Sequence, residues 1–140
     1  MGKVQILAVL TMDGCLSSEL YDKAHQDLCL DRCGLDEIRE KALYHVTPDY
    51  SISMLHEWRK DGTNIRYLAE ATPYTSDYIN GLLRMHAVDE IILYTVPFIA
   101  GTGRHFFKSA LPEQHWTLSS LKSYSNGVCR IIYILDKKAR

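Results

Sequence analysis

Two glycine-containing turns, each directly after a strongly apolar run, are the places where this sequence could do chemistry. The first turn covers residues 11–14 and contains Asp13 and Gly14, and the second covers residues 101–103. Glycine lets a backbone turn sharply or approach a ligand closely. Open α/β sheets bind ligands just beyond the carboxyl ends of their strands. Arg104 and His105 follow the second turn, and could bind phosphate or be ordinary exposed loop residues.

The run before the second turn is the most apolar stretch of the chain. From Ile91 to Ile99 both odd and even positions are apolar, with interruptions at Thr95 and Pro97. This pattern predicts a strand buried on both faces. Pro97 cannot donate to a strand ladder, so we expect a bulge or the end of strand pairing there. Lys3 to Thr11 shows the same two-sided pattern and predicts a second central strand.

The rest of the chain alternates between helix and strand patterns. We expect these elements, in chain order: a helix from Ser17 or Ser18 to Arg32, a short helix Leu35–Lys41, a short strand Ala42–Val46, a helix Ser51–Asp61 stopped by Gly62, a strand Asn64–Leu68, and a helix capped by Ser76 with Ile79, Leu82, Leu83 and His86 facing inward. Such alternation builds parallel crossovers. An Asn-Gly turn at residues 125–127 then joins two strands, His115–Tyr124 and Val128–Leu135, as a hairpin whose last strand is substantially buried.

These elements predict a three-layer α/β fold with a mainly parallel central sheet and a C-terminal antiparallel hairpin, in one domain over residues 1–140. The net charge of −1 argues against nucleic acid as the main partner. An apolar run of about 18 residues, which a membrane span needs, is absent from the sequence. The chain enters a strand-like run directly, without a signal-peptide pattern, so we expect it in the cytoplasm.

In that compartment the four cysteines are expected to be free thiols. His25, Cys29 and Cys33 would share one stripe of a helix, and imidazole and thiolates bind zinc well. A fourth ligand is not evident, and buried thiols explain the same residues. We therefore predict no metal site.

The order of features resembles the dihydrofolate reductase superfamily, and most closely the reductase domain of the riboflavin-biosynthesis deaminase-reductase and its stand-alone relatives. The resemblance covers Lys3–Gly14, most of Met54–Phe107 and the C-terminal hairpin. It is carried by Asp13-Gly14, by MLHEWRKDGTNIRYLAEA with its Glu70, and by VDEIILYTVPFIAGTGRHFF. It implies the dihydrofolate reductase-like arrangement, trimmed by one helix-strand unit.

The resemblance also implies a function and its residues. The expected activity is NADPH-dependent reduction of a pterin, pyrimidine or related heterocycle, with Asp13 and Thr95 as the catalytic residues near which the substrate carbon is held. The implied cofactor-binding residues are Gly14, Glu70, Ala71, Thr72, Gly101, Thr102, Gly103 and Arg104. For Thr95, a β-branched residue suited to a strand is an equal explanation. For Asp13 and Gly14, a plain turn that ends the strand is an equal explanation as well. Candidates for a catalytic carboxylate on the first helix are Glu19, Asp22 and Asp27, although acidic residues near a helix start are more often partners of the helix dipole. Relatives are commonly homodimers, and the aromatics Phe106, Phe107 and Trp116 could serve such an interface.

Two departures from the family pattern open a second interpretation. Relatives bind the pyrophosphate at a glycine pair that begins a helix, because glycine lets backbone amides approach the phosphates. Here Ala71 and Thr72 replace that pair, and Pro73, which has no amide hydrogen, follows. The family's glycine-arginine-x-threonine segment is also missing between Cys15 and Met54. The alternative is a non-catalytic or repurposed ligand-binding or assembly protein of this fold that has lost the dinucleotide site.

Overall fold

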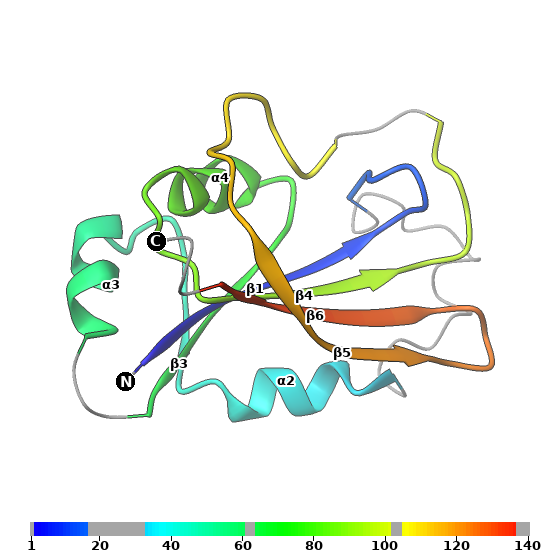
Figure 1. The fold of residues 1–140 in the computed structure, drawn as a ribbon, viewed down its shortest axis with the longest axis horizontal. Coiled ribbons are helices and arrows are strands. Elements are labelled where there is room, and N and C mark those ends of the chain that lie inside the picture. Colours follow the sequence, from blue (N-terminus) through cyan, green and yellow to red (C-terminus); the bar gives the residue numbers. More distant parts are fainter. Residues whose placement is uncertain (1, 17–32, 61–63, 102–104, 137–140) are drawn as a thin grey trace.

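The computed structural model describes residues 2–16, 33–60, 64–101 and 105–136, which form a mixed sheet with helices on both faces (Figure 1). The strands are β1 (Lys3–Leu10), β2 (Tyr44–His45), β3 (Arg66–Glu70), β4 (Glu90–Thr95), β5 (Trp116–Ser123) and β6 (Cys129–Leu135). The helices are α2 (Leu35–Lys41), α3 (Ile52–Trp58) and α4 (Ser76–Arg84). None of these helices has the length and apolar character that crossing a membrane requires. The helix expected up to Arg32 lies outside the described residues.

The six strands form one sheet in the order β2-β3-β1-β4-β6-β5. The first four are parallel, whereas β6 runs antiparallel to β4 and β5 antiparallel to β6. The predicted fold class is therefore confirmed. β1 and β4 are the two central strands and lie side by side, with Gln5 opposite Glu90 and Leu10 opposite Thr95. This confirms the prediction from their two-sided apolar patterns.

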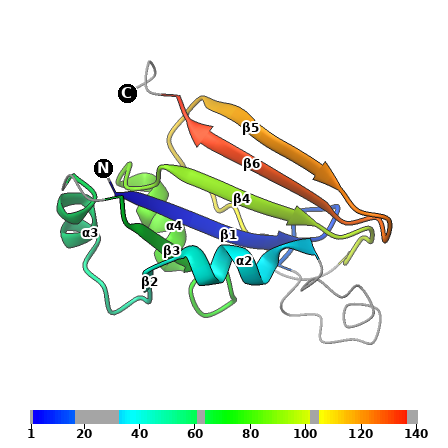
Figure 2. The same ribbon diagram turned by 90° about the horizontal axis from the view of Figure 1, so that it is seen from below.

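Side chains of the central strands feed two separate cores. On β1, Val4 and Ile6 pack with α3 and α4 residues such as Leu55 and Ile79, while Leu7 packs on the opposite face with the α2 side. Figure 2 shows α2 on one face of the sheet and α4 on the other. Burying apolar side chains on both faces is what fixes β1 and β4 in the middle of the sheet.

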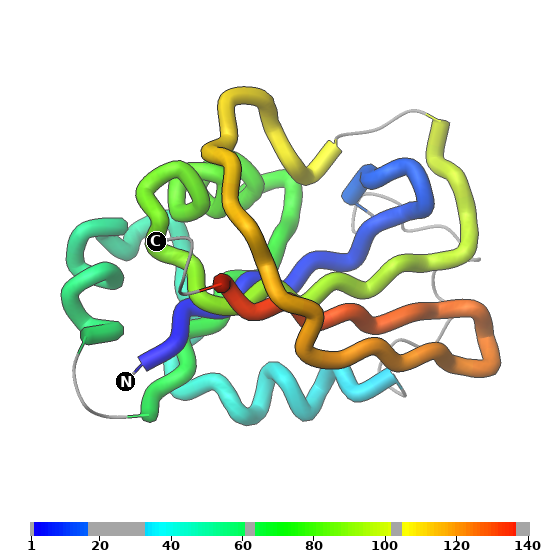
Figure 3. The backbone as a smooth tube through the Cα atoms, viewed as in Figure 1, coloured from blue at the N-terminus to red at the C-terminus, as the bar shows by residue number. Residues whose placement is uncertain are grey.

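The carboxyl end of β4 is set by Pro97. The strand ends at Thr95, and the Val96 amide still donates to Leu10 O at 2.9 Å. Pro97 has no hydrogen to continue the ladder, so the chain leaves the sheet there, as predicted. Figure 3 shows that the loop after β4 and the turn after β1 lie at the same end of the sheet.

Several boundaries differ from those expected from the sequence. The α2 helix has the predicted bounds, whereas β2 is confined to two residues. β3 lies two residues later than expected because its pairing with β1 continues to Leu7 opposite Glu70. Helix α4 begins at Ser76, with Thr75 as its N-cap residue. His86 was expected to face inward, but α4 ends at Arg84, and His86 is exposed with a left-handed φ of 54°.

The C-terminal hairpin forms as predicted but is less buried than expected. Most residues of β6 are only half-buried, because its neighbour β5 is an exposed edge strand. Phe106 is fully buried, so the suggestion that it is exposed for an interface is wrong. Phe107 is 44% exposed and Trp116 half-buried. A homodimer through these two residues stays a prediction.

A buried ion pair joins the starting ends of these elements. The Arg59 guanidinium lies 3.1 Å from the Asp89 carboxylate, and both side chains are largely buried. Arg59 also donates to His86 O at 2.9 Å, and Asp89 Oδ2 accepts from the Val4 amide at 3.0 Å. The pair thus connects the end of α3, the loop after α4, and the starts of β1 and β4.

Replacing Arg59 by leucine should destabilise the fold strongly, because it removes the buried cation that pairs with the Asp89 carboxylate. We expect a loss of about 3–5 kcal/mol in the free energy of unfolding. Urea denaturation followed by circular dichroism would measure it. The matched control is Lys60→Leu, which breaks an exposed pair with Glu57 and should change stability by about 0–1 kcal/mol. Equal losses in the two variants would contradict this role of Arg59.

Candidate functional site

The Asp13 carboxylate joins the turns that follow the two central strands. Its Oδ1 accepts from the Ala100 amide at 3.1 Å, and its Oδ2 accepts from the Gly101 amide at 3.0 Å. The Thr11 hydroxyl donates to Oδ1 through a short hydrogen bond. A second link comes from the Met12 amide, which donates to Phe98 O at 2.9 Å. The two predicted turns are therefore one structural unit.

Hydrogen bonding lowers the pKa of Asp13 below its ordinary value. The Thr11 hydroxyl has the largest effect, followed by the Ala100 amide, and together with the Gly101 amide they lower the pKa of Asp13 to about 2. Donors to a carboxylate favour its charged form. Such a group cannot donate a proton at neutral pH, but it can accept hydrogen bonds and fix the position of its neighbours. The geometry thus favours a positioning role for Asp13.

Both glycines of this unit adopt backbone conformations that favour glycine. Gly14 has a φ of 82° and Gly101 a φ of 74°. A short antiparallel bridge pairs Cys15 with His105, and the Phe106 amide donates to Gly14 O at 3.1 Å. The chain therefore returns to the first turn after passing the second. The candidates Thr102, Gly103 and Arg104 lie outside the described residues.

Thr95 lies at the same end of the sheet, as the last residue of β4. It pairs with Leu10 of β1 on one side and with Cys129 of β6 on the other, and it is half-buried. The structure therefore brings Asp13, Gly14, Thr95 and Gly101 together at the carboxyl ends of β1 and β4. Their functional roles stay predictions.

Buried Asn80 of α4 holds the segment that returns to this end of the sheet. Its Nδ2 donates to Phe106 O at 2.8 Å, and its Oδ1 accepts from the Lys108 amide at 3.0 Å. The sequence analysis missed this residue, because the local sequence does not indicate which distant residues an asparagine on a helix contacts. An asparagine in the middle of a predicted inward helix face was the only available signal.

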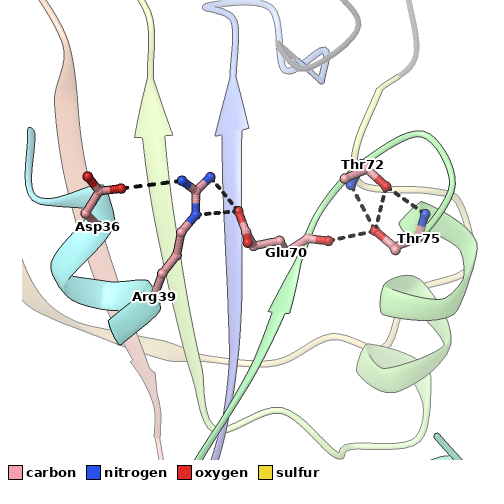
Figure 4. Close-up of polar contacts among 5 residues, drawn as sticks. All are labelled: Asp36, Arg39, Glu70, Thr72 and Thr75. Atoms are coloured by element: carbon pink, nitrogen blue, oxygen red, sulfur yellow. Dashed lines mark hydrogen bonds and ion pairs between the residues drawn. The ribbon is translucent and has the colours of Figure 1, made fainter. Parts of the chain in front are cut away.

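The remaining candidates, Glu70, Ala71 and Thr72, lie at the end of β3 and make contacts of their own, of which Figure 4 shows those of Glu70 and Thr72. The Glu70 carboxylate accepts from Arg39 Nε at 3.0 Å and from Arg39 Nη2 at 2.8 Å. Arg39 belongs to α2, and its Nη1 also lies 3.6 Å from Asp36 Oδ1. Ala71 is buried, and its amide donates to Leu7 O at 2.8 Å. These contacts connect β3 to α2 and β1.

Thr72 and Thr75 close the β3–α4 loop on itself (Figure 4). The Thr72 amide donates to Thr75 Oγ1 at 2.9 Å, and the Thr75 amide donates to Thr72 Oγ1 at 3.1 Å. The Thr75 hydroxyl also donates to Glu70 O at 2.7 Å. The amides of Thr72 and Thr75, which precede the first turn of α4, are thus already used. The Thr-x-x-Thr spacing was the available signal for this closure.

This loop does not fit the pyrophosphate of a dinucleotide. A helix start binds phosphate through free backbone amides and the positive end of the helix dipole. Here Thr72 and Thr75 occupy amides, Pro73 has none, and Asp77 places a carboxylate in the first turn of α4. Residues 72, 73 and 75 therefore offer an anion no free amide, and the Asp77 carboxylate opposes an anion at this helix start.

The zinc hypothesis concerns residues that are only partly described. Cys33 is a buried free thiol, whereas His25 and Cys29 lie outside the described residues. Cys15 and Cys129 are also free thiols. The candidate carboxylates Glu19, Asp22 and Asp27 likewise fall outside the described ranges.

Comparison with known proteins rests on structure alone. No family model matches the chain, and no curated protein matches its sequence. A protein assigned to riboflavin biosynthesis from Shewanella sp. PV-4 superimposes with a TM-score of 0.61 at 11% identity, over 96% of this chain and 99% of that one. Two crystal forms of Acinetobacter baumannii RibD give TM-scores of 0.65 and 0.63 at 10% identity. The chain has the dihydrofolate reductase-like fold.

The two RibD chains are longer than this chain, and the superposition covers only part of them. The chain is covered over 97% and 98% of its length, but it spans only 58% and 59% of the RibD chains. The mixed sheet with its C-terminal hairpin is the shared part. The superpositions establish the reductase-like fold. Because the sequence identities are low, the activity has to be argued from the site.

Replacing Asp13 by asparagine should make thermal stability less dependent on pH in the acid range. The folded-state pKa of Asp13, about 2, is below its ordinary value of 3.8, so its stabilising effect is present above 3.8 and lost as the pH falls towards 2. The melting temperature of the variant should lie below that of the unaltered protein at pH 6, and this gap should narrow by pH 2. Circular dichroism melts at both pH values test this, and a constant gap would argue against it.

Replacing Thr75 by valine should open the β3–α4 loop. The variant loses the bonds to Glu70 O and the Thr72 amide, so we expect a loss of about 1–3 kcal/mol in the free energy of unfolding. Thr117→Val, at an exposed position of β5, is the matched control and should change stability by less than about 0.5 kcal/mol. Urea titration would measure both variants, and a neutral Thr75→Val would mean that the loop does not depend on these bonds.

Proposed function

We propose that this chain is a repurposed member of the reductase fold that binds a small heterocycle at the carboxyl ends of β1 and β4 without a dinucleotide at the β3–α4 loop. The observation that supports the proposal is the closure of that loop by Thr72 and Thr75, which uses the backbone amides of both residues. Asp77 adds a negative charge at the same helix start.

The proposed ligand site lies where the two central strands end. The Asp13 carboxylate accepts hydrogen bonds from the Ala100 and Gly101 amides, so the two turns are joined to each other instead of being independent loops. We call the residues at these strand ends, Asp13, Gly14, Thr95 and Gly101, the Asp13 rim. Parallel α/β sheets bind ligands at this edge, beyond the ends of adjacent strands. The fold is shared with proteins of riboflavin biosynthesis, which supports a pterin, pyrimidine or related heterocycle as the ligand class.

A second candidate function is the NADPH-dependent reduction of such a heterocycle. It is favoured by the retained pair of turns, in which Gly14 and Gly101 keep their left-handed conformations. NADPH would supply the hydride, and Thr95 and the Asp13 unit would position the substrate. Because the β3–α4 loop does not fit the pyrophosphate, this candidate requires the nucleotide to be held elsewhere.

Two titrations separate these candidates. NADPH binding is followed by the fluorescence of the cofactor, and binding of dihydrofolate or a pyrimidine by calorimetry, both with the unaltered protein. Our proposal predicts saturable binding of a heterocycle and no saturable binding of NADPH. Consumption of NADPH in the presence of the heterocycle would establish the second candidate, and binding of neither would overturn both.

A glycine variant tests the reason for the difference. The double substitution Ala71→Gly and Thr72→Gly, combined with a shortened 73–75 loop, removes both the Thr72 hydroxyl and its cross-bonds to Thr75. If the closed loop excludes the nucleotide, this variant should gain NADPH binding while keeping its affinity for the heterocycle. The matched control changes Thr117 to glycine on exposed β5 and should gain nothing.

A further inference from the structure

A polar pocket lies between α2 and the sheet, away from the turns that follow β1 and β4. Its volume is about 250 Å³, and it is lined by α2, by the first halves of β1, β3 and β4, and by β6. The sheet residues belong to the same face as Leu7 and Ile92, which α2 covers (Figure 2). Four cationic side chains and two carboxylates line it, a net charge of +2: Lys3, Lys41, Arg66 and Arg130, with Glu37 and Glu90.

The cations of this pocket are not neutralised by ion pairs. Lys3 and Arg66 lie directly opposite each other on β1 and β3, and both are half-buried. Within the described residues, the ion pairs of the protein involve other side chains. Like charges directly opposite each other destabilise a sheet. An anion bound between them would remove this repulsion.

Two buried polar atoms in the lining also have no hydrogen-bond partner. Gln5 is only 5% exposed, and its Nε2 donates to Glu90 Oε2 at 3.0 Å, but its Oε1 has no donor. Arg130 Nε is likewise buried and has no acceptor. Buried polar atoms are normally satisfied, so such a pair indicates a ligand or solvent that completes it. A ligand here must accept from Arg130 and donate to Gln5.

We propose that this pocket binds hydrogen phosphate. Its oxygens would accept from the guanidinium groups of Arg130 and Arg66, and its remaining O–H would donate to Gln5 Oε1. The nearby Glu90 carboxylate is a further acceptor that disfavours a fully deprotonated oxyanion. Sulfate has the same shape and charge but no proton, so the same lining should reject it. This site is separate from the proposed heterocycle site and does not depend on it.

Calorimetric titration of the unaltered protein with phosphate and with sulfate, at pH 7 and matched ionic strength, tests this selectivity. We expect saturable phosphate binding and sulfate binding weaker by roughly tenfold or more, the effect of one lost charge-assisted hydrogen bond. Gln5→Met removes the acceptor and should bring the two affinities closer together. Glycerol 3-phosphate is the third ligand, because a phosphomonoester has largely lost its last proton at pH 7, and it should bind more weakly than phosphate.

Arg66→Gln should weaken phosphate binding by roughly tenfold or more. The matched control is Arg84→Gln, which removes the same charge from an exposed position on α4, where Arg84 donates to Ser109 O, and it should leave affinity unchanged. Should Arg66→Gln not fold, amide chemical shifts of the unaltered protein decide the matter, with phosphate shifting residues of β1 and α2 around the pocket. Equal affinity for sulfate, tighter binding of glycerol 3-phosphate, no binding at about 10 mM phosphate, or an equal effect of Arg84→Gln would overturn the proposal.

Discussion

The hydrogen bonds between Asp13 and the Ala100 and Gly101 amides hold together the turns that follow the two central strands of the described sheet. The apolar pattern places β1 and β4 next to each other, but it does not determine where the chain goes once each strand has ended. The Asp13 carboxylate accepts hydrogen bonds from two amides of the second turn and so fixes the position of the two turns relative to each other. The arrangement of the two turns therefore depends on the hydrogen bonds of one side chain.

In the β3–α4 loop, side-chain hydrogen bonds stay within one loop and do not join it to another turn. At the carboxyl ends of β1 and β4, hydrogen bonds join two turns to each other. At the end of β3, the hydroxyls of Thr72 and Thr75 accept hydrogen bonds from amides of their own loop. Arg39 donates hydrogen bonds to the Glu70 carboxylate. The ends of β1 and β4 are thus joined to each other, whereas the loop after β3 is closed by its own side chains. This contrast is the physical basis for separating heterocycle binding from dinucleotide binding.

Much of the fold could be predicted from local sequence, because burial on one or both faces leaves a periodic pattern. The central positions of β1 and β4, the bounds of α2 and the break at Pro97 all follow from such patterns. The contacts that shape the site could not be predicted in this way. Arg39 and Glu70 are 31 residues apart, and Asn80 and Phe106 are 26 apart. No local pattern identifies partners at that separation, and Asp13 was predicted as catalytic before its bonds to the second turn were known.

The most direct measurement is a map of amide chemical shifts of the isotope-labelled protein during titration with dihydrofolate. If the account is right, the largest changes fall on the rim formed by Gly14, Thr95 and Gly101, while Thr72 and Thr75 change little. Changes centred on Thr72, Thr75 and the start of α4, with the Asp13 rim unaffected, would contradict it.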